Sequence, residues 1–211
     1  VVGAAICRDP RIAGIAFTGS TETARLIERS LAAQSGAIAA LIAETGGLNA
    51  MIVDSSALAE QVVVDVVNSG FNSAGQRCSA LRLLVVQEEI AGRVLALLAG
   101  YMDELSVGNP AQLATDIGPV IDSQSLAVLE AHAALITSGA RWHHRVPASA
   151  AEDGGLYFRP LAVEIDRIGQ LQREVFGPIV HVVRYKATEL DAVIDAINAL
   201  GYGLTLGLHT R

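Results

Sequence analysis

The sequence predicts a layered α/β protein built on a mainly parallel sheet. Strand-like apolar runs alternate along the chain with segments of helical periodicity, which is the pattern of consecutive β–α–β units. The 211 residues are 51% hydrophobic but only 4% aromatic, so the core must be assembled from Ala, Val, Leu and Ile. Alanine-rich helices on valine-rich strands suit a layered α/β protein better than an all-β sandwich.

Each element is predicted from its hydrophobic period and from the turn residues that bound it. Strands are expected at residues 12–17, 37–43, 49–53, 81–86, 157–165, 179–185 and 204–209. Helices are expected at residues 22–34, 57–69, 91–105, 123–138 and 189–200. Asp54 or Ser55 is expected to cap the second helix. Residues 147–155 are polar and contain glycine, which indicates a surface loop.

Charge and cysteine content exclude several classes of function. The net charge is −7 without a cluster of Lys or Arg, which argues against nucleic acid. No stretch reaches the roughly 18 apolar residues that a membrane-spanning helix requires. Cys7 and Cys78 are the only cysteines, so neither a disulfide framework nor a metal site is expected. We expect a reducing, cytoplasmic location. The chain lacks an initiating Met and ends in a strand-like run, so both ends are expected to be internal cuts.

Two motifs follow the first two predicted strands. Gly19 and Ser20 precede a helix, where backbone N–H groups can bind a phosphate, although a Ser in this position is more often an N-cap. Glu44, followed by Thr45, Gly46 and Gly47, ends an apolar strand. A partly desolvated Glu there could act as a general base. The alternative is a solvated glutamate at a strand end.

Two further motifs precede later strands. Cys78 lies in a polar loop beside Arg77, and a nearby cation and backbone amides favour a reactive cysteine, whereas most free cysteines are buried and inert. All five His residues lie at position 132 or later, so a Cys–His dyad has no local support. The segment 174–178 combines an acid, an aromatic residue and a turn. Its alternative interpretation is a loop entering a strand, with Phe176 packed in the core.

Taken in this order, the four motifs resemble those of the aldehyde dehydrogenase superfamily along essentially the whole chain. The sequence is most similar to the L-glutamate γ-semialdehyde (Δ1-pyrroline-5-carboxylate) dehydrogenases. Within these it resembles the dehydrogenase half of the bifunctional proline utilization A proteins. The resemblance rests on Phe-Thr-Gly-Ser-Thr-Glu-Thr-Ala at 17–24, Asn-Ala-Met-Ile-Val-Asp-Ser-Ser-Ala at 49–57, Gly-Gln-Arg-Cys-Ser-Ala-Leu at 75–81 and Gly-Tyr-Gly-Leu-Thr at 201–205.

The resemblance implies a role for each motif. Cys78 would attack the aldehyde, Glu44 would activate the water that hydrolyses the resulting thioester, and Ser79 would help form the aldehyde pocket. The cofactor would be NAD, with NADP left open. Its binding residues would be Gly19, Ser20, Thr45, Gly46, Glu174 and Phe176.

The same resemblance implies the architecture and the partners. Residues 1–43 would end a Rossmann-like nucleotide-binding domain, and residues 44–211 would form most of an α/β catalytic domain, with the active site between the two. The full-length protein would be a homo-oligomer, with or without a fused proline dehydrogenase domain, and this segment would contact neither nucleic acid nor membrane.

The expected reaction is oxidation of L-glutamate γ-semialdehyde to glutamate in proline catabolism. The alternatives are another aldehyde dehydrogenase subfamily, or an inactive fragment that acts only in assembly. The isolated 211-residue chain is expected to show no turnover, because half of the cofactor site would be missing.

Overall fold

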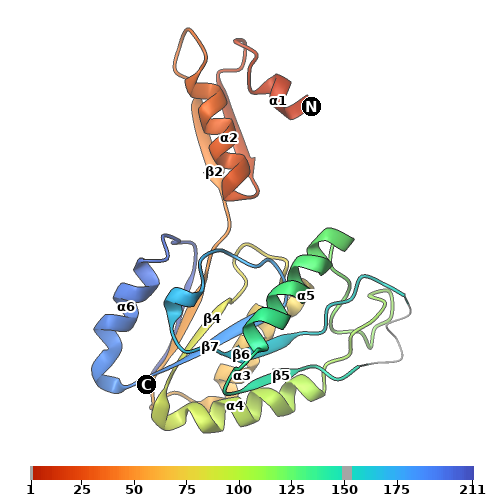
Figure 1. Ribbon diagram of the computed structural model, residues 1–211, viewed down its shortest axis with the longest axis vertical. Helices are drawn as coiled ribbons and strands as arrows, with labels where there is room; N and C mark the ends of the chain where they lie inside the picture. The colour runs from red at the N-terminus through yellow and green to blue at the C-terminus, as the bar shows by residue number, and fades with distance from the viewer. Residues whose placement is uncertain (1, 149–153) are drawn as a thin grey trace. The chain divides into compact units, whose positions relative to one another are not determined.

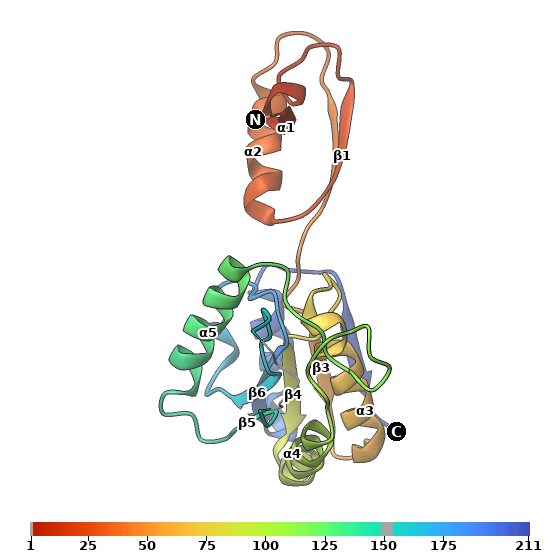
Figure 2. The same cartoon turned by 90° about the vertical axis from the view of Figure 1, so that its right-hand side faces the viewer.

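The computed structural model describes residues 2–148 and 154–211. The chain divides into two compact units, the first ending at Gly46 and the second beginning at Gly47. Each unit is described separately, and both are drawn in Figures 1 and 2. The domain roles assigned to residues 1–43 and 44–211 stay predictions.

The first unit is a single β–α–β unit preceded by a short helix. It consists of α1 (Val2–Ile6), β1 (Gly14–Thr18), α2 (Thr21–Ala32) and β2 (Ala40–Glu44). The two strands are parallel and paired from Gly14 with Ala40 to Thr18 with Glu44. The α2 helix buries Ala24, Ile27 and Leu31 on one side, and Ile27 and Leu31 pack with Cys7.

The second unit contains a six-stranded sheet in the order β5-β6-β7-β4-β3-β8. Its strands are β3 (Ala50–Val53), β4 (Leu83–Gln87), β5 (His143–Arg145), β6 (Leu161–Glu164), β7 (Ile179–Tyr185) and β8 (Leu206–His209). Its helices are α3 (Ala59–Gly70), α4 (Glu88–Asp103), α5 (Ser123–Thr137) and α6 (Leu190–Asn198), with short 3-10 turns at Asn72–Gly75, Ile168–Gln170 and Ala187–Glu189. Only β5 runs antiparallel to its neighbour; the other paired strands of this sheet are parallel.

Helices cover both faces of this sheet, as Figure 2 shows. Successive strand residues point to opposite faces, and both faces of β3 and β4 are apolar. On one face Met51 and Leu84 pack against α3 and α4. On the other, Ile52 and Val85 belong to a cluster that includes Val193 of α6. The predicted mixed α/β fold with a mainly parallel sheet is confirmed.

Several predicted details were wrong. The α3 helix begins after Leu58, which makes no side-chain cap. Asp54, a predicted cap, instead accepts a hydrogen bond from the backbone N–H of Ser56 at 2.7 Å and stabilises the turn before the helix. The predicted strand 157–165 is shorter, because β6 begins only at Leu161. The α1 helix and β5 were not predicted, and residues 149–153 of the predicted loop lie outside the described residues. None of the described helices is long and apolar enough to cross a membrane.

Candidate functional site

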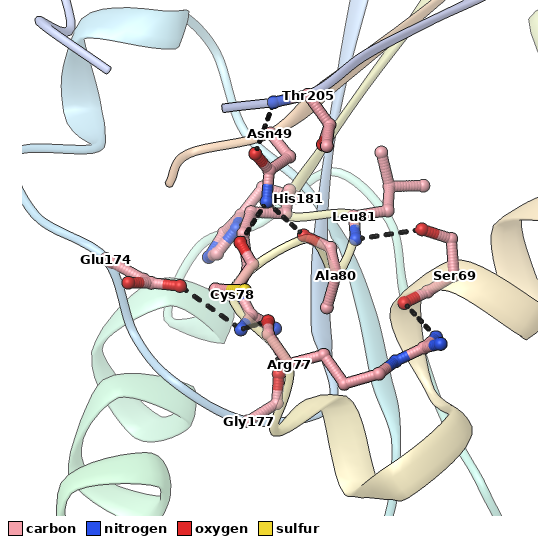
Figure 3. Close-up of polar contacts among 11 residues, drawn as sticks. Asn49, Ser69, Arg77, Cys78, Ala80, Leu81, Glu174, Gly177, His181 and Thr205 are labelled. Atoms are coloured by element: carbon pink, nitrogen blue, oxygen red, sulfur yellow. Dashed lines mark hydrogen bonds and ion pairs between the residues drawn. The ribbon is translucent and has the colours of Figure 1, made fainter. Parts of the chain in front are cut away.

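Four segments of the second unit meet at the edge of the sheet where β3, β4, β7 and β8 begin. The backbone N–H groups of Arg82 and Leu83 both donate to the carbonyl oxygen of Asn49, at 3.0 and 3.1 Å. The backbone N–H of His181 donates to the carbonyl oxygen of Arg82 at 2.8 Å. Because these strands are parallel, the segments that lead into them converge, and they include two of the predicted motifs (Figure 3).

Cys78 is an exposed free thiol on the loop that leads into β4. The loop begins with three consecutive residues of positive φ, namely Ser73 (59°), Ala74 (52°) and Gly75 (62°). Strain of this kind in non-glycine residues persists only where the surrounding structure holds it, and it clusters at functional sites. A Cβ at position 75 would collide with the carbonyl group of Gly177. The cysteine loop and the segment 174–178 are therefore packed backbone to backbone.

A buried amide holds the backbone of Cys78. The Nδ2 atom of Asn49 donates to the carbonyl oxygens of Cys78 and Ala80, at 2.7 and 2.9 Å. Its Oδ1 atom accepts from the backbone N–H of Thr205 at 3.1 Å. Asn49 is 4% exposed, and these contacts, visible in Figure 3, connect the cysteine loop to the start of β8.

The two arginines near Cys78 differ in their surroundings. Arg77 is exposed, and its guanidinium donates to the carbonyl oxygens of Asn68 and Ser69, at 2.7 and 3.3 Å. A cation is favourable there, at the last turn of α3. Its hydrogen bonds thus go to the helix end rather than to the cysteine that it was expected to activate. Arg82 is fully buried and points toward the segment 174–178.

Glu174 and Phe176 both lie against Arg82. The Oε1 atom of Glu174 is 3.3 Å from Nη2 of Arg82, and the glutamate side chain is 15% exposed. The ring centroid of Phe176 is 5.3 Å from Cζ of Arg82. The alternative interpretation of this segment, with Phe176 in the core, was wrong: Phe176 is exposed, whereas its neighbour Val175 is buried.

His181 is a further buried polar residue near the same edge. Its Nδ1 atom lies 2.9 Å from the carbonyl oxygen of Arg82, and its Nε2 atom lies 2.8 Å from Nε2 of His132. A carbonyl only accepts, so Nδ1 of His181 carries the proton and its Nε2 accepts from His132. Burial lowers the pKa of His181 to about 4, so this ring is neutral at pH 7.

Ser79 is exposed beside Cys78 in the second unit. The other predicted residues belong to the first unit or to its boundary. The backbone N–H of Gly19 donates to the carbonyl oxygen of Glu44 at 3.1 Å. The hydroxyl of Ser20 accepts from the backbone N–H of Thr23 at 3.2 Å and caps α2. Within the first unit the Glu44 side chain is exposed, as in the alternative of a solvated glutamate at a strand end. Thr45 and Gly46 are half-buried.

The sequence patterns did not identify three residues of the site, namely Asn49, Arg82 and His181. The available signal was a polar or charged residue inside an apolar run, which must find partners if the run is buried. Asn49 and Arg82 lie within the predicted strands 49–53 and 81–86, and His181 interrupts the run 179–185. The sequence alone does not reveal their partners.

The aldehyde dehydrogenase family model matches residues 1–211. The bifunctional protein PutA of Klebsiella aerogenes is 51% identical over 218 residues, and that of Escherichia coli K12 is 52% identical. Both alignments cover the whole chain but only 17% and 16% of the relatives, so the chain spans about one sixth of their length. The 1-pyrroline-5-carboxylate dehydrogenase of Geobacillus thermodenitrificans is 32% identical over 216 residues, which cover 41% of that protein.

Solved structures resemble the chain over its full length. A crystal structure of a bifunctional proline utilization A protein matches with a TM-score of 0.95 and 54% identity, and the match covers 21% of that protein. Betaine aldehyde dehydrogenase from Staphylococcus aureus, crystallised in complex with NAD+, matches with a TM-score of 0.90 and 26% identity over 42% of its chain.

Proposed function

Because the chain belongs to the aldehyde dehydrogenase family, we propose that it carries the nucleophile and the hydrolytic base of an enzyme that oxidises an aldehyde to a carboxylic acid. The family and the aldehyde dehydrogenase-like fold expected from the motifs are both confirmed. The observation that supports the role of Cys78 most directly is its exposed thiol on a strained loop that is fixed on both sides, by Asn49 and by Gly177.

In the proposed reaction the thiolate of Cys78 attacks the carbonyl carbon of the aldehyde. A carbon–sulfur bond forms, and the carbonyl oxygen becomes an oxyanion in a thiohemiacetal. The backbone N–H of Cys78 would donate to this oxyanion. Loss of hydride from the carbon then leaves a thioester on Cys78. Glu44 would remove a proton from the water that hydrolyses it, which frees the acid and the thiol.

We propose NAD as the cofactor, which when bound accepts the hydride that leaves the substrate carbon. The residues present fit this group in chemistry. Glu174 is a partly exposed carboxylate, and a carboxylate accepts several hydrogen bonds, so it could accept from ribose hydroxyls while remaining paired with Arg82. Phe176, exposed beside it, would pack near the nicotinamide ring.

The first unit would hold the rest of the cofactor. The α2 helix has 12 residues, and the N–H groups of its first turn, with Gly19 and Ser20, would bind the pyrophosphate. The Ser20 hydroxyl also serves as the N-cap, and the two uses are compatible because the backbone amides carry the anion. Thr45 and Gly46 would line the nicotinamide side.

The proposed substrate is L-glutamate γ-semialdehyde, with Ser79 in the aldehyde pocket. Its support is the similarity to PutA proteins and to a 1-pyrroline-5-carboxylate dehydrogenase over the whole chain. We further propose a cytoplasmic homo-oligomer with a fused proline dehydrogenase domain. Both cysteines of this chain are free, as a reducing compartment requires.

The test is NADH formation by the full-length protein, with L-glutamate γ-semialdehyde compared with a short aliphatic aldehyde and betaine aldehyde. We expect the wild-type protein to have its highest kcat/KM with the semialdehyde. Cys78→Ala should form no NADH, whereas Cys7→Ala, which removes the other thiol, should stay active. No NADH with any aldehyde would refute the oxidation, and a higher kcat/KM for another aldehyde would refute the substrate.

A further inference from the structure

Arg82 is a completely buried cation at the amino edge of the six-stranded sheet. Its side chain is 0% exposed. Burial lowers the pKa of the guanidinium, an effect that the carboxylate of Glu174 opposes. Burial of a charge is expensive unless the charge is paired and hydrogen-bonded. The partners of Arg82 therefore indicate why a charge is kept at this position.

Those partners belong to two segments that are far apart in the sequence. The Nη1 atom donates to the carbonyl oxygen of Gly177 at 2.8 Å, and Nη2 donates to that of Arg77 at 3.2 Å. Arg77 directly precedes Cys78. One guanidinium thus ties the loop of the proposed nucleophile to the segment 174–178.

The same guanidinium also orients the side chains of that segment. Its Nη2 atom is 3.3 Å from Oε1 of Glu174. Its Cζ atom is 5.3 Å from the centroid of Phe176, an arrangement in which a cation is attracted to the ring face. The two residues proposed to contact the nicotinamide riboside therefore share one support with the loop of the proposed nucleophile.

We propose that Arg82 is a positioning residue that sets the spacing between the nucleophile and the nicotinamide end of the cofactor site. The inference rests on the proposed function. A guanidinium is a rigid planar fork that can hold three acceptors at fixed angles, whereas the ammonium of lysine is a single point of charge on a flexible stem. Arg82→Lys therefore keeps the charge but loses the spacing.

The experiment compares the full-length wild-type protein with Arg82→Lys and Arg82→Met. The matched control is Arg184→Met, which removes an arginine of β7 that is paired with Glu164 at 2.9 Å, away from the amino edge. Three quantities are measured per folded molecule: the Kd of NAD by calorimetry, the rate at which iodoacetamide alkylates the Cys78 peptide without cofactor, and kcat.

We expect both Arg82 variants to raise the Kd of NAD about tenfold, as for the loss of one hydrogen bond to a charged group. We also expect a changed alkylation rate and a lower kcat. In Arg184→Met all three quantities should stay within about twofold of wild type, because this arginine shares no partner with Arg82. If Arg82→Met does not fold, Arg82→Lys decides. Wild-type Kd and alkylation rate in folded Arg82→Lys would overturn the inference. Both readouts are independent of turnover, so an absence of NADH from the wild type would refute the proposed function alone.

Discussion

The side-chain amide of Asn49 donates a hydrogen bond of 2.7 Å to the carbonyl oxygen of Cys78. The same amide also donates to the carbonyl oxygen of Ala80 and accepts from the backbone N–H of Thr205. A single buried side chain thus fixes the backbone of the proposed nucleophile on the sheet. Because the thiol itself is exposed, its direction depends on such backbone contacts.

We expect Asn49→Ala to lower the free energy of unfolding by about 2–4 kcal/mol, because three hydrogen bonds are lost and buried polar groups are left unpaired. We also expect kcat to fall about tenfold, because the loop of Cys78 loses a fixed geometry. Urea unfolding and NADH formation by the full-length protein measure both. Asn198→Ala, at an exposed position on α6, is the control and should stay within about 0.5 kcal/mol of wild type. Wild-type stability in Asn49→Ala would contradict the role of this amide.

Two glycine-to-alanine substitutions should have opposite effects. Gly75 has a φ of 62°, and its Cβ would meet the backbone of Gly177. Gly75→Ala should therefore destabilise the protein by at least about 2 kcal/mol. Gly92 lies within α4, and a Cβ there meets nothing within 4 Å. Gly92→Ala should therefore stabilise it by about 0.5–1 kcal/mol. Urea unfolding of both variants is the measurement, and equal shifts of the same sign would show that the close contact at Gly75 is unimportant.

The parts of the fold that were predictable are those with a strong hydrophobic signal. Residues 179–185 form an apolar run, and β7 has the bounds expected for it. By contrast, β5 is a three-residue strand of His and Arg, whose pairing with β6 depends on tertiary position rather than on its own sequence. The α1 helix has five residues and none of them is buried. Its sequence therefore shows no helical period of apolar residues from which it could be predicted.

The candidate site was predictable only where chemistry shows in a local motif. Cys78 stands in a recognisable loop, and Glu174 begins a compact acid–aromatic–turn segment. Their supports were not predictable, because Asn49 is 29 residues from Cys78 and Arg82 is 92 residues from Glu174 in the sequence. Such contacts arise from the parallel register of the strands, which brings the starts of distant strands to one edge.

Acid should destabilise the fold through His181. Burial lowers the pKa of this residue to about 4, whereas an unfolded chain has a histidine pKa of about 6.5. Between these two values the unfolded state binds more protons, so stability falls as the pH falls from about 6.5 to 4. The full loss would be about 3 kcal/mol. Burial also lowers the pKa of His132, which adds a contribution of the same sign.

Urea midpoints measured from pH 4 to 7.5 test this prediction. His181→Asn removes the titrating group, so we expect a flatter pH dependence below pH 6.5 even if the variant is less stable at pH 7. Asn198→Ala alters an exposed residue that does not titrate and should leave the slope unchanged. An equally steep slope in His181→Asn would assign the acid sensitivity to other groups.

Glu44 offers the sharpest test of the proposed chemistry, because its role falls after hydride transfer. In Glu44→Gln the attack by Cys78 and the oxidation remain possible, but no carboxylate accepts the proton of the hydrolytic water. We expect a burst of about one NADH per active site followed by a steady rate at least about a hundredfold below wild type. The acyl group should remain on the Cys78 peptide, where mass spectrometry detects it as a thioester.

Glu28→Gln, which alters an exposed glutamate of α2 paired with Arg25, should keep the wild-type steady rate. A Glu44→Gln protein that turns over at the wild-type rate and carries no acyl adduct would show that another group activates the water.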